Sequence, residues 1–333
     1  MDEKVKRFYK VMSDFKKVGL IKTCFHHKKE ECNGAIKQAH SVQRNGRLSI
    51  IEGEVNGNMC VYTFTSGIPN EKSPIADLKP IGKKEASTFF GFCDYHDSKL
   101  FSDIENNQFD GSDKHLFLHS YRSFAHSYHR KNEEVKVYNN PDSEFVKILP
   151  PKLVETMKKG GEQSLNELNE RKKQLDIYLE SEDYSVLNYL VYEKEGLYPF
   201  AVSSQMGPKV SYRNKPMNNH NDYNVPFSQL MVTMLPDVNK TFVVLAAFPD
   251  DAKAINLLDE LDQLEDLELE RAITSLIIAN CENTFFSPSF WNSLSKSEKE
   301  RLLLEVEMNT SSPMLHDHFF KSHFNFFDSK YKV

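Results

Sequence analysis

The sequence predicts an α+β fold, in which an N-terminal module rich in cysteine and histidine precedes a second α+β unit with a mainly antiparallel sheet. Helical apolar spacing dominates the first half of the chain, and strand-like runs begin after Ser185. Four of the five cysteines lie within the first hundred residues, and three of them have metal-like spacing in the company of several histidines. The change from helical to strand-like spacing of apolar residues near Ser185 therefore indicates two folding units.

Length and composition agree with a globular chain of two domains. A chain of 333 residues is longer than a single small domain. Its 39% hydrophobic residues, with 24 Phe and 14 Tyr, exclude wholesale disorder. We predict a module over 1–139, a helical spacer over 140–184 and an α+β domain over 185–333. The net charge of −6 argues against a protein that coats nucleic acid with its whole surface.

The chain offers no signal for a membrane or for secretion. No run approaches the roughly 18 apolar residues of a membrane span, and the N-terminal residues lack the apolar core of a signal peptide. Cysteines at metal-like spacing fit a reducing compartment better than a disulfide framework. We expect a cytoplasmic protein without a membrane partner and without disulfides.

The N-terminal half predicts a helix, a hairpin and a second helix. Apolar spacing predicts a helix over 3–18 that ends at Gly19, and two strands over 47–65 flank the turn Asn56-Gly57. A loop follows over 66–80. An apolar run then leads to Cys93 and to a helix that starts near Asp97 or Ser98.

The rest of the chain predicts helices and then strands. A patterned helix covers 114–131. A further helix is expected over 151–183, interrupted at Gly160-Gly161, and its charged part after Ser164 predicts an exposed spacer. Strands are expected over 186–192, 199–204, 228–235 and 241–248, the last two as an antiparallel pair. Helices are expected over 250–264, 266–281 and 296–308, where Ser295 and Glu298 form a capping box for the last.

Two short-spaced pairs of potential ligands predict a structural zinc ion. Zinc prefers four sulfur or nitrogen ligands in a tetrahedron, and the pairs here are Cys24 with Cys32 and Cys93 with His96. A knuckle, a hairpin and a helix whose first turn carries the last ligands is the treble-clef plan. The wide spacing of the first pair leaves His26, His27 or His40 as possible replacements for one ligand, and buried cysteines with a core histidine are the alternative without metal. Cys60 and Cys281 lie in apolar segments and are expected in the core.

His40 raises the question of catalysis. Treble-clef nucleases of the HNH kind use a histidine on the hairpin to activate water beside a second divalent metal. Such a metal needs an oxygen-rich position, for which the sequence offers Asp97 and little else. A structural role, or a contact with nucleic acid, is the alternative for His40.

Basic residues are concentrated at the N-terminal end. Residues 1–47 are rich in Lys and Arg, which favours a local contact with DNA or RNA, while a solvated helix face is the alternative. Arg44 and Arg47 are the candidate contacts in this segment. On the helix over 114–131, His119 and Arg122 share a face with His126 and His129 and are further candidates, with an ordinary solvated face as the alternative.

Several motifs resemble a family of bacterial proteins of unknown function. These are Cys24 and Cys32 followed by Ala39-His40-Ser41-Val42-Gln43, then Gly91-Phe92-Cys93 with His96-Asp97, and Asn283-Thr284-Phe285-Phe286-Ser287-Pro288 with Trp291. The resemblance covers most of the chain, includes a distant similarity to HNH and treble-clef modules, and supports the zinc site. It implies no established activity, although association with mobile elements suggests defence against phage.

Two hypotheses of function follow. In the first, a zinc-stabilised protein recognises nucleic acid through its basic N-terminal module and cleaves it if His40 is catalytic. In the second, zinc only replaces a core, and aromatic surfaces at 285–291 and 319–327 contact a protein partner or a second copy of the chain.

Overall fold

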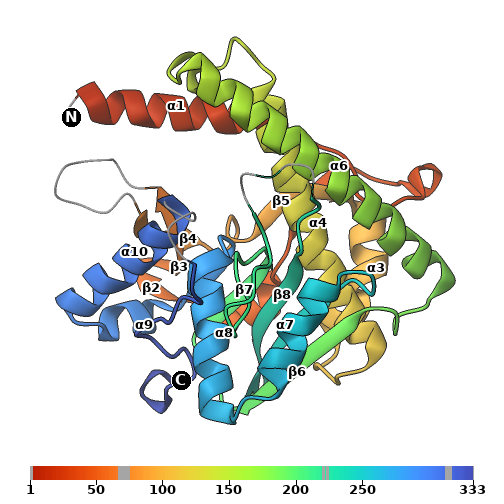
Figure 1. The fold of residues 1–333 in the computed structure, drawn as a ribbon, viewed down its shortest axis with the longest axis vertical. Helices are drawn as coiled ribbons and strands as arrows, with labels where there is room; N and C mark the ends of the chain where they lie inside the picture. Colours follow the sequence, from red (N-terminus) through yellow and green to blue (C-terminus); the bar gives the residue numbers. More distant parts are fainter. Residues whose placement is uncertain (1–2, 67–75, 220–221, 223–224, 312–316, 333) are drawn as a thin grey trace.

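The computed structural model describes residues 3–66, 76–219, 222, 225–311 and 317–332, and it confirms the α+β fold. Within these ranges the strands form one large sheet and one two-stranded sheet. Helices lie against the large sheet on both of its faces (Figure 1). None of the helices in the described ranges combines the length and the apolar character that crossing a bilayer requires.

The large sheet is antiparallel throughout and has eight strands. Seven strands run in the order β2-β3-β10-β7-β8-β9-β6, and β4 pairs along the other edge of β3. The four strands expected after Ser185 are confirmed as β6 to β9. The strands are Gly53–Val55 (β2), Asn58–Ser66 (β3), Ala76–Gly82 (β4), Asn188–Glu195 (β6), Phe200–Met206 (β7), Leu230–Asp237 (β8), Lys240–Ala247 (β9) and Thr284–Phe286 (β10).

The hairpin around Asn56-Gly57 is confirmed, but its first strand is shorter than predicted. Both turn residues have positive φ, 52° and 78°, which a two-residue hairpin turn requires and which Asn and Gly tolerate. Before the turn, residues 44–51 are helical (η2, Arg44–Leu48; α2, Ser49–Ile51) instead of extended. Of the loop predicted over 66–80, residues 76–80 belong to β4, and 67–75 lie outside the described residues.

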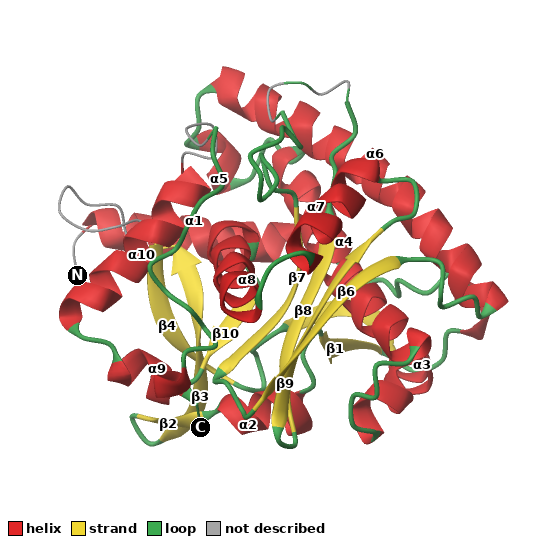
Figure 2. Cartoon of the chain, turned by 60° about the horizontal axis from the view of Figure 1, so that its bottom comes forward, coloured by secondary structure: helices red, strands yellow, loops and turns green. Residues whose placement is uncertain are grey.

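Helices form a layer on each face of the large sheet. The central helix α4 packs on β7, β8 and β9, while α7 and α8 cover the opposite face (Figure 2). The capping box of α10 is confirmed, because Ser295 N donates to Glu298 Oε2 at 2.8 Å and Glu298 N donates to Ser295 Oγ at 3.2 Å. The helices are α1 (Glu3–Gly19), α3 (Asp94–Asn106), α4 (Asp113–Tyr138), α5 (Glu144–Lys147), α6 (Pro151–Ser181), α7 (Ala252–Asp262), α8 (Asp266–Asn280), α9 (Pro288–Ser293) and α10 (Lys296–Ser311), with short turns η1 (Lys29–Glu31) and η4 (Ser329–Tyr331).

The predicted break at Gly160-Gly161 was wrong, because α6 runs through both glycines. Gly161 is buried against α4, and a Cβ there would lie 3.1 Å from Val135 Cγ2. The pair thus allows two helices to approach closely. Leu168, Leu175 and Leu179 continue this contact, so α6 packs on the core with one face and is not merely an exposed spacer.

The two aromatic segments proposed as partner surfaces are largely interior. Phe286 in β10 and Phe326 in the C-terminal segment are fully buried, and both rings pack on Phe200 of β7. The segment 284–286 is a strand that joins β3 to β7. The second hypothesis stays a prediction, and the partly buried rings that these segments leave to it are Trp291, Phe319 and Phe320.

Strands from both sides of the predicted spacer share the large sheet. β2, β3 and β4 come from residues 53–82, whereas β6 to β10 come from residues 188–286. The division into 1–139, 140–184 and 185–333 stays a prediction, and β10 is the element through which the two groups of strands are joined.

Candidate metal centre

Four side chains from three segments meet beside the two-stranded sheet. Cys24 lies after α1, Cys32 follows η1, and Cys93 and His96 lie at the start of α3. β1 (Ile36–His40) pairs with β5 (Thr88–Cys93), and the register places Ile36 opposite Cys93. This pairing brings the first ligand pair to the second. The ladder beside the cluster is thus β1–β5, and the hairpin β2–β3, predicted as part of the metal module, belongs to the large sheet.

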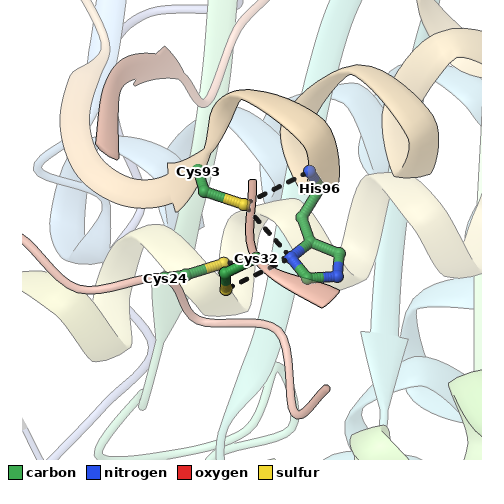
Figure 3. A group of neighbouring side chains, drawn as sticks. All are labelled: Cys24, Cys32, Cys93 and His96. Carbon is green, nitrogen blue, oxygen red and sulfur yellow. Dashed lines mark hydrogen bonds between the residues drawn. The ribbon is translucent and has the colours of Figure 1, made fainter. Parts of the chain in front are cut away.

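The geometry of the four ligand atoms suits a metal ion. His96 Nδ1 lies 3.5 Å from Cys24 Sγ, 3.6 Å from Cys32 Sγ and 3.2 Å from Cys93 Sγ (Figure 3). All four ligand atoms lie within 4.8 Å of one another. A tetrahedral ion with metal–sulfur bonds of about 2.3 Å and a metal–nitrogen bond of about 2.0–2.1 Å places sulfur and nitrogen about 3.6 Å apart. The group could therefore hold one metal ion.

The three histidines considered as replacement ligands lie outside this group. His26 stacks on the His96 ring at 3.9 Å, and its Nδ1 accepts a hydrogen bond from Lys28 N. His27 Nε2 lies 2.8 Å from Glu180 Oε2, and His40 Nδ1 lies 3.0 Å from the Ala86 carbonyl oxygen. The structure therefore places Cys32 with Cys24, Cys93 and His96.

The electrostatics of the thiols favour a bound cation. Burial raises the pKa of Cys93, but hydrogen bonds from the backbone N–H groups of His96 and Asn33 lower it more, so the net shift is downward. Cys93 is also the N-cap of α3, where the helix dipole favours negative charge. Loss of solvation and the neighbouring thiols raise the pKa of Cys32 to about 12. Three thiolates therefore repel one another unless a divalent cation lies between them.

The far side of the His96 ring adds a feature that the sequence did not reveal. Its Nδ1 faces the sulfurs, whereas its Nε2 is buried and has no hydrogen-bond partner among the described residues. Glu31 Oε2 is the carboxylate oxygen opposite Nε2, at 4.0 Å. A histidine that binds metal through one nitrogen usually donates the other N–H to such a group. The position of Glu31 is a consequence of the turn η1, and no sequence motif indicates this residue.

His40, at the end of β1, has the tautomer of a base. Because its Nδ1 can only donate to the Ala86 carbonyl, Nε2 keeps its lone pair. Burial lowers the pKa of His40, so the ring is neutral at neutral pH. The ring is half-buried, and the charged groups that act on it are Arg44, Arg122 and Glu105.

A preformed second metal position is not part of the described structure. Within the described ranges, Cys24, Cys32, Cys93 and His96 are the one group of three or more Cys, His, Asp or Glu residues with ligand atoms close enough for an ion. Asp97 is half-buried, and burial raises the pKa of its carboxyl. The second divalent metal therefore stays a prediction that no cluster of carboxylates supports.

Three of the four candidate nucleic-acid contacts are buried. Arg47 pairs with Asp237 at 2.7 and 3.0 Å, and Arg122 pairs with Glu105 and lies 4.1 Å over the Phe101 ring. His119 packs beside the stacked rings of Phe109 and Phe242. Arg44 is half-buried, and its Nε donates to Asn45 Oδ1.

The exposed polar face predicted for the helix over 114–131 was wrong. Arg122, His126 and His129 are buried together with His119, because α4 is enclosed by the sheet on one side and by α3 and α6 on others. The sequence signal for this burial was the apolar and aromatic residues placed all round the helix, among the histidines.

Comparisons of this chain with known proteins found no match. No protein-family model, no curated protein and no solved structure matches it.

Proposed function

We propose that this chain is a zinc-stabilised protein that binds nucleic acid through its basic N-terminal helix. The observation that carries the proposal is the Cys24, Cys32, Cys93 and His96 group, whose spacing fits a tetrahedral ion. Three sulfurs and one imidazole nitrogen are a ligand set typical of structural zinc, with no position left for substrate. Lys29, whose Nζ donates to the Cys24 carbonyl, offsets part of the negative charge of such a centre.

The basic surface lies on α1. Lys6, Arg7, Lys16 and Lys17 are exposed along this helix, and its buried residues, Val11 and Gly19, leave the basic ones on the solvent side. The helix packs on α4 and α5, so its orientation is fixed by the core. A local row of positive charge on a chain of net charge −6 favours phosphate at this helix.

Binding to labelled DNA and RNA over a range of salt concentrations tests the nucleic-acid proposal. We expect the metal-loaded protein to bind with an affinity that falls steeply with salt, and Lys16→Glu with Lys17→Glu to weaken binding at least tenfold. The matched control, Lys152→Glu with Lys296→Glu, makes the same change of charge on α6 and α10. Equal loss in both variants, or no salt-dependent binding by the wild type, contradicts the proposal.

His40 favours a second candidate function, cleavage of the bound nucleic acid. Its neutral ring with a free Nε2 lone pair is the state that a general base needs. A nuclease assay with Mg²⁺ or Mn²⁺ compares the wild type with His40→Ala, whose melting temperature reports the fold. Cleavage that disappears in a folded His40→Ala protein supports an enzyme. Binding without cleavage by the wild type leaves the binding function alone.

A further inference from the structure

A cavity lies away from the metal centre, on the side of α4 that faces the C-terminal elements. Its volume is about 710 Å³, within the range of about 300–1,000 Å³ that is usual for small-molecule sites. Residues of α4, the end of β7, the C-terminal end of α8 and α10 line it. The cavity is therefore formed by elements from both halves of the chain.

One wall of the cavity is apolar. Met206 at the end of β7, Leu276 in α8 and Val306 in α10 are buried residues of the main core that also line the cavity. The half-buried ring of Phe64 in β3 adds an aromatic surface. A flat apolar group, such as an aromatic ring, would be desolvated against this wall.

The polar part of the lining places hydrogen-bond acceptors at the C-terminal end of α8, while the cations Arg130 and Lys209 line other parts of the cavity. Asn283 donates its Nδ2 hydrogens to Ser41 Oγ at 2.8 Å and to the Ser203 carbonyl at 2.6 Å, which leaves its Oδ1 as an acceptor. Asn280 Nδ2 donates to the Leu276 carbonyl at 2.9 Å, so its Oδ1 is also an acceptor. Glu282 adds a carboxylate, and the C-terminal end of α8 adds partial negative charge.

We propose that this cavity binds a small molecule whose aromatic ring carries an amino group, as in an aminopurine or aminopyrimidine nucleoside. The ring lies on the apolar wall, and the amino group donates to the acceptors at the end of α8. Gln205, whose amide offers both a donor and an acceptor, completes recognition of a heterocycle. This proposal does not depend on the metal or on the nucleic-acid function.

The position of Asn283 gives such a ligand a route to the N-terminal module. Its hydrogen bond to Ser41 ends one residue from His40, and Ser41 N donates to the Ser87 carbonyl in the same module. A ligand that changes the orientation of Asn283 thus acts on the segment that carries His40.

Two pairs of nucleosides test the ligand class on the full metal-loaded chain. Adenosine and cytidine carry the amino group, and inosine and uridine have an oxygen in its place. We expect calorimetry to give adenosine or cytidine a dissociation constant at least tenfold lower than its partner's, with a rise in melting temperature. Equal affinities within both pairs overturn the ligand class. No binding of any of the four nucleosides overturns the proposal.

Three variants test the location. Asn280→Leu removes an acceptor at similar volume and should weaken binding at least tenfold, and Ala279→Trp should abolish it by filling the cavity. Asn107→Leu, at an exposed amide after α3, should bind like the wild type. The melting temperature of each free variant shows whether it is folded. Undiminished binding by both folded cavity variants contradicts the location.

Discussion

Cys93 combines two structural roles in one side chain. Its sulfur belongs to the metal group, and it also accepts the backbone N–H of His96 as the N-cap of α3, at 3.5 Å. The helix start and the metal ligands are therefore coupled, because the residue that begins the helix also fixes the position of the next ligand. Removal of this side chain takes away a cap and a ligand together, whereas serine can replace the cap but not the ligand.

We expect Cys93→Ser to abolish tight metal binding and to unfold the segment from Cys24 to α3, because ligand binding there is part of the folding free energy. Metal content after dialysis and limited proteolysis measure the two effects. Cys60→Ser is the matched control, since Cys60 is buried in β3 away from the ligands. The prediction is wrong if Cys93→Ser keeps its metal, or if Cys60→Ser loses it.

We expect Glu31→Gln to lower metal affinity about 10–100-fold, because Glu31 is the carboxylate opposite His96 Nε2, at 4.0 Å, and such a carboxylate usually orients a ligand histidine. Competition with a chelator measures the affinity. Glu30→Gln changes the neighbouring exposed carboxylate and should leave the affinity unchanged. A similar loss in both variants would indicate a general effect of surface charge instead of orientation.

The metal ligands could be predicted from the sequence, because they occur as short-spaced pairs. Cys93 and His96 are three residues apart at a helix start, and the structure brings that pair to Cys24 and Cys32. Arg47 and Arg122 could not be placed, because their partners Asp237 and Glu105 are contributed by the tertiary fold. From the sequence alone, a basic residue is expected at the surface. Only the folded structure shows that an acidic partner neutralises its charge in the interior.

At the scale of elements, the three-residue strand β10 connects two parts of the large sheet. It is the strand that pairs with β3 on one side and with β7 on the other. Its central role was hidden in the sequence, because Thr284–Phe286 is too short for a strand pattern and is followed by a proline that suggests a turn. The longer strands β6 to β9 could be predicted, since each carries a run of apolar residues.

We expect Phe286→Ala to destabilise the protein by about 3–5 kcal/mol, the usual range for a fully buried Phe. The ring is enclosed by Phe64, Phe200, Phe290 and Phe326, so the cavity it leaves cannot close easily. Denaturant unfolding measures the change. Leu304→Ala, at an exposed position of α10, should cost no more than about 0.5 kcal/mol. Comparable losses in the two variants would contradict a bridging role for β10.

At the scale of the whole molecule, buried histidines make the stability of the folded state depend on pH. Burial, followed by the charges of Arg130 and His129, lowers the pKa of His126 to about 3, and burial also lowers the pKa of His119. In the unfolded chain a histidine takes up its proton near pH 6.5. Below pH 6.5 the unfolded state therefore binds protons that the folded state does not, and stability falls as the pH falls.

We expect His126→Gln to reduce this dependence by about one proton, or about 1.4 kcal/mol per pH unit, between pH 6 and pH 4. Denaturant unfolding of both proteins at several pH values, with metal in excess, measures the slopes. Above pH 7 the two slopes should agree, because the imidazole is neutral in both states there. Equal slopes below pH 6 would show that His126 is protonated in the folded protein.

The metal group also determines how the chain would respond to a pulling force. Cys24 and Cys32 precede the strands β2 to β4, and Cys93 and His96 follow them. A metal bound to all four ligands closes a loop around that segment. When force is applied to the two ends of the chain, tension passes through the metal–sulfur bonds and bypasses residues 33–92. Those roughly 60 residues, about 200 Å of extended chain, lengthen only after the metal bonds break.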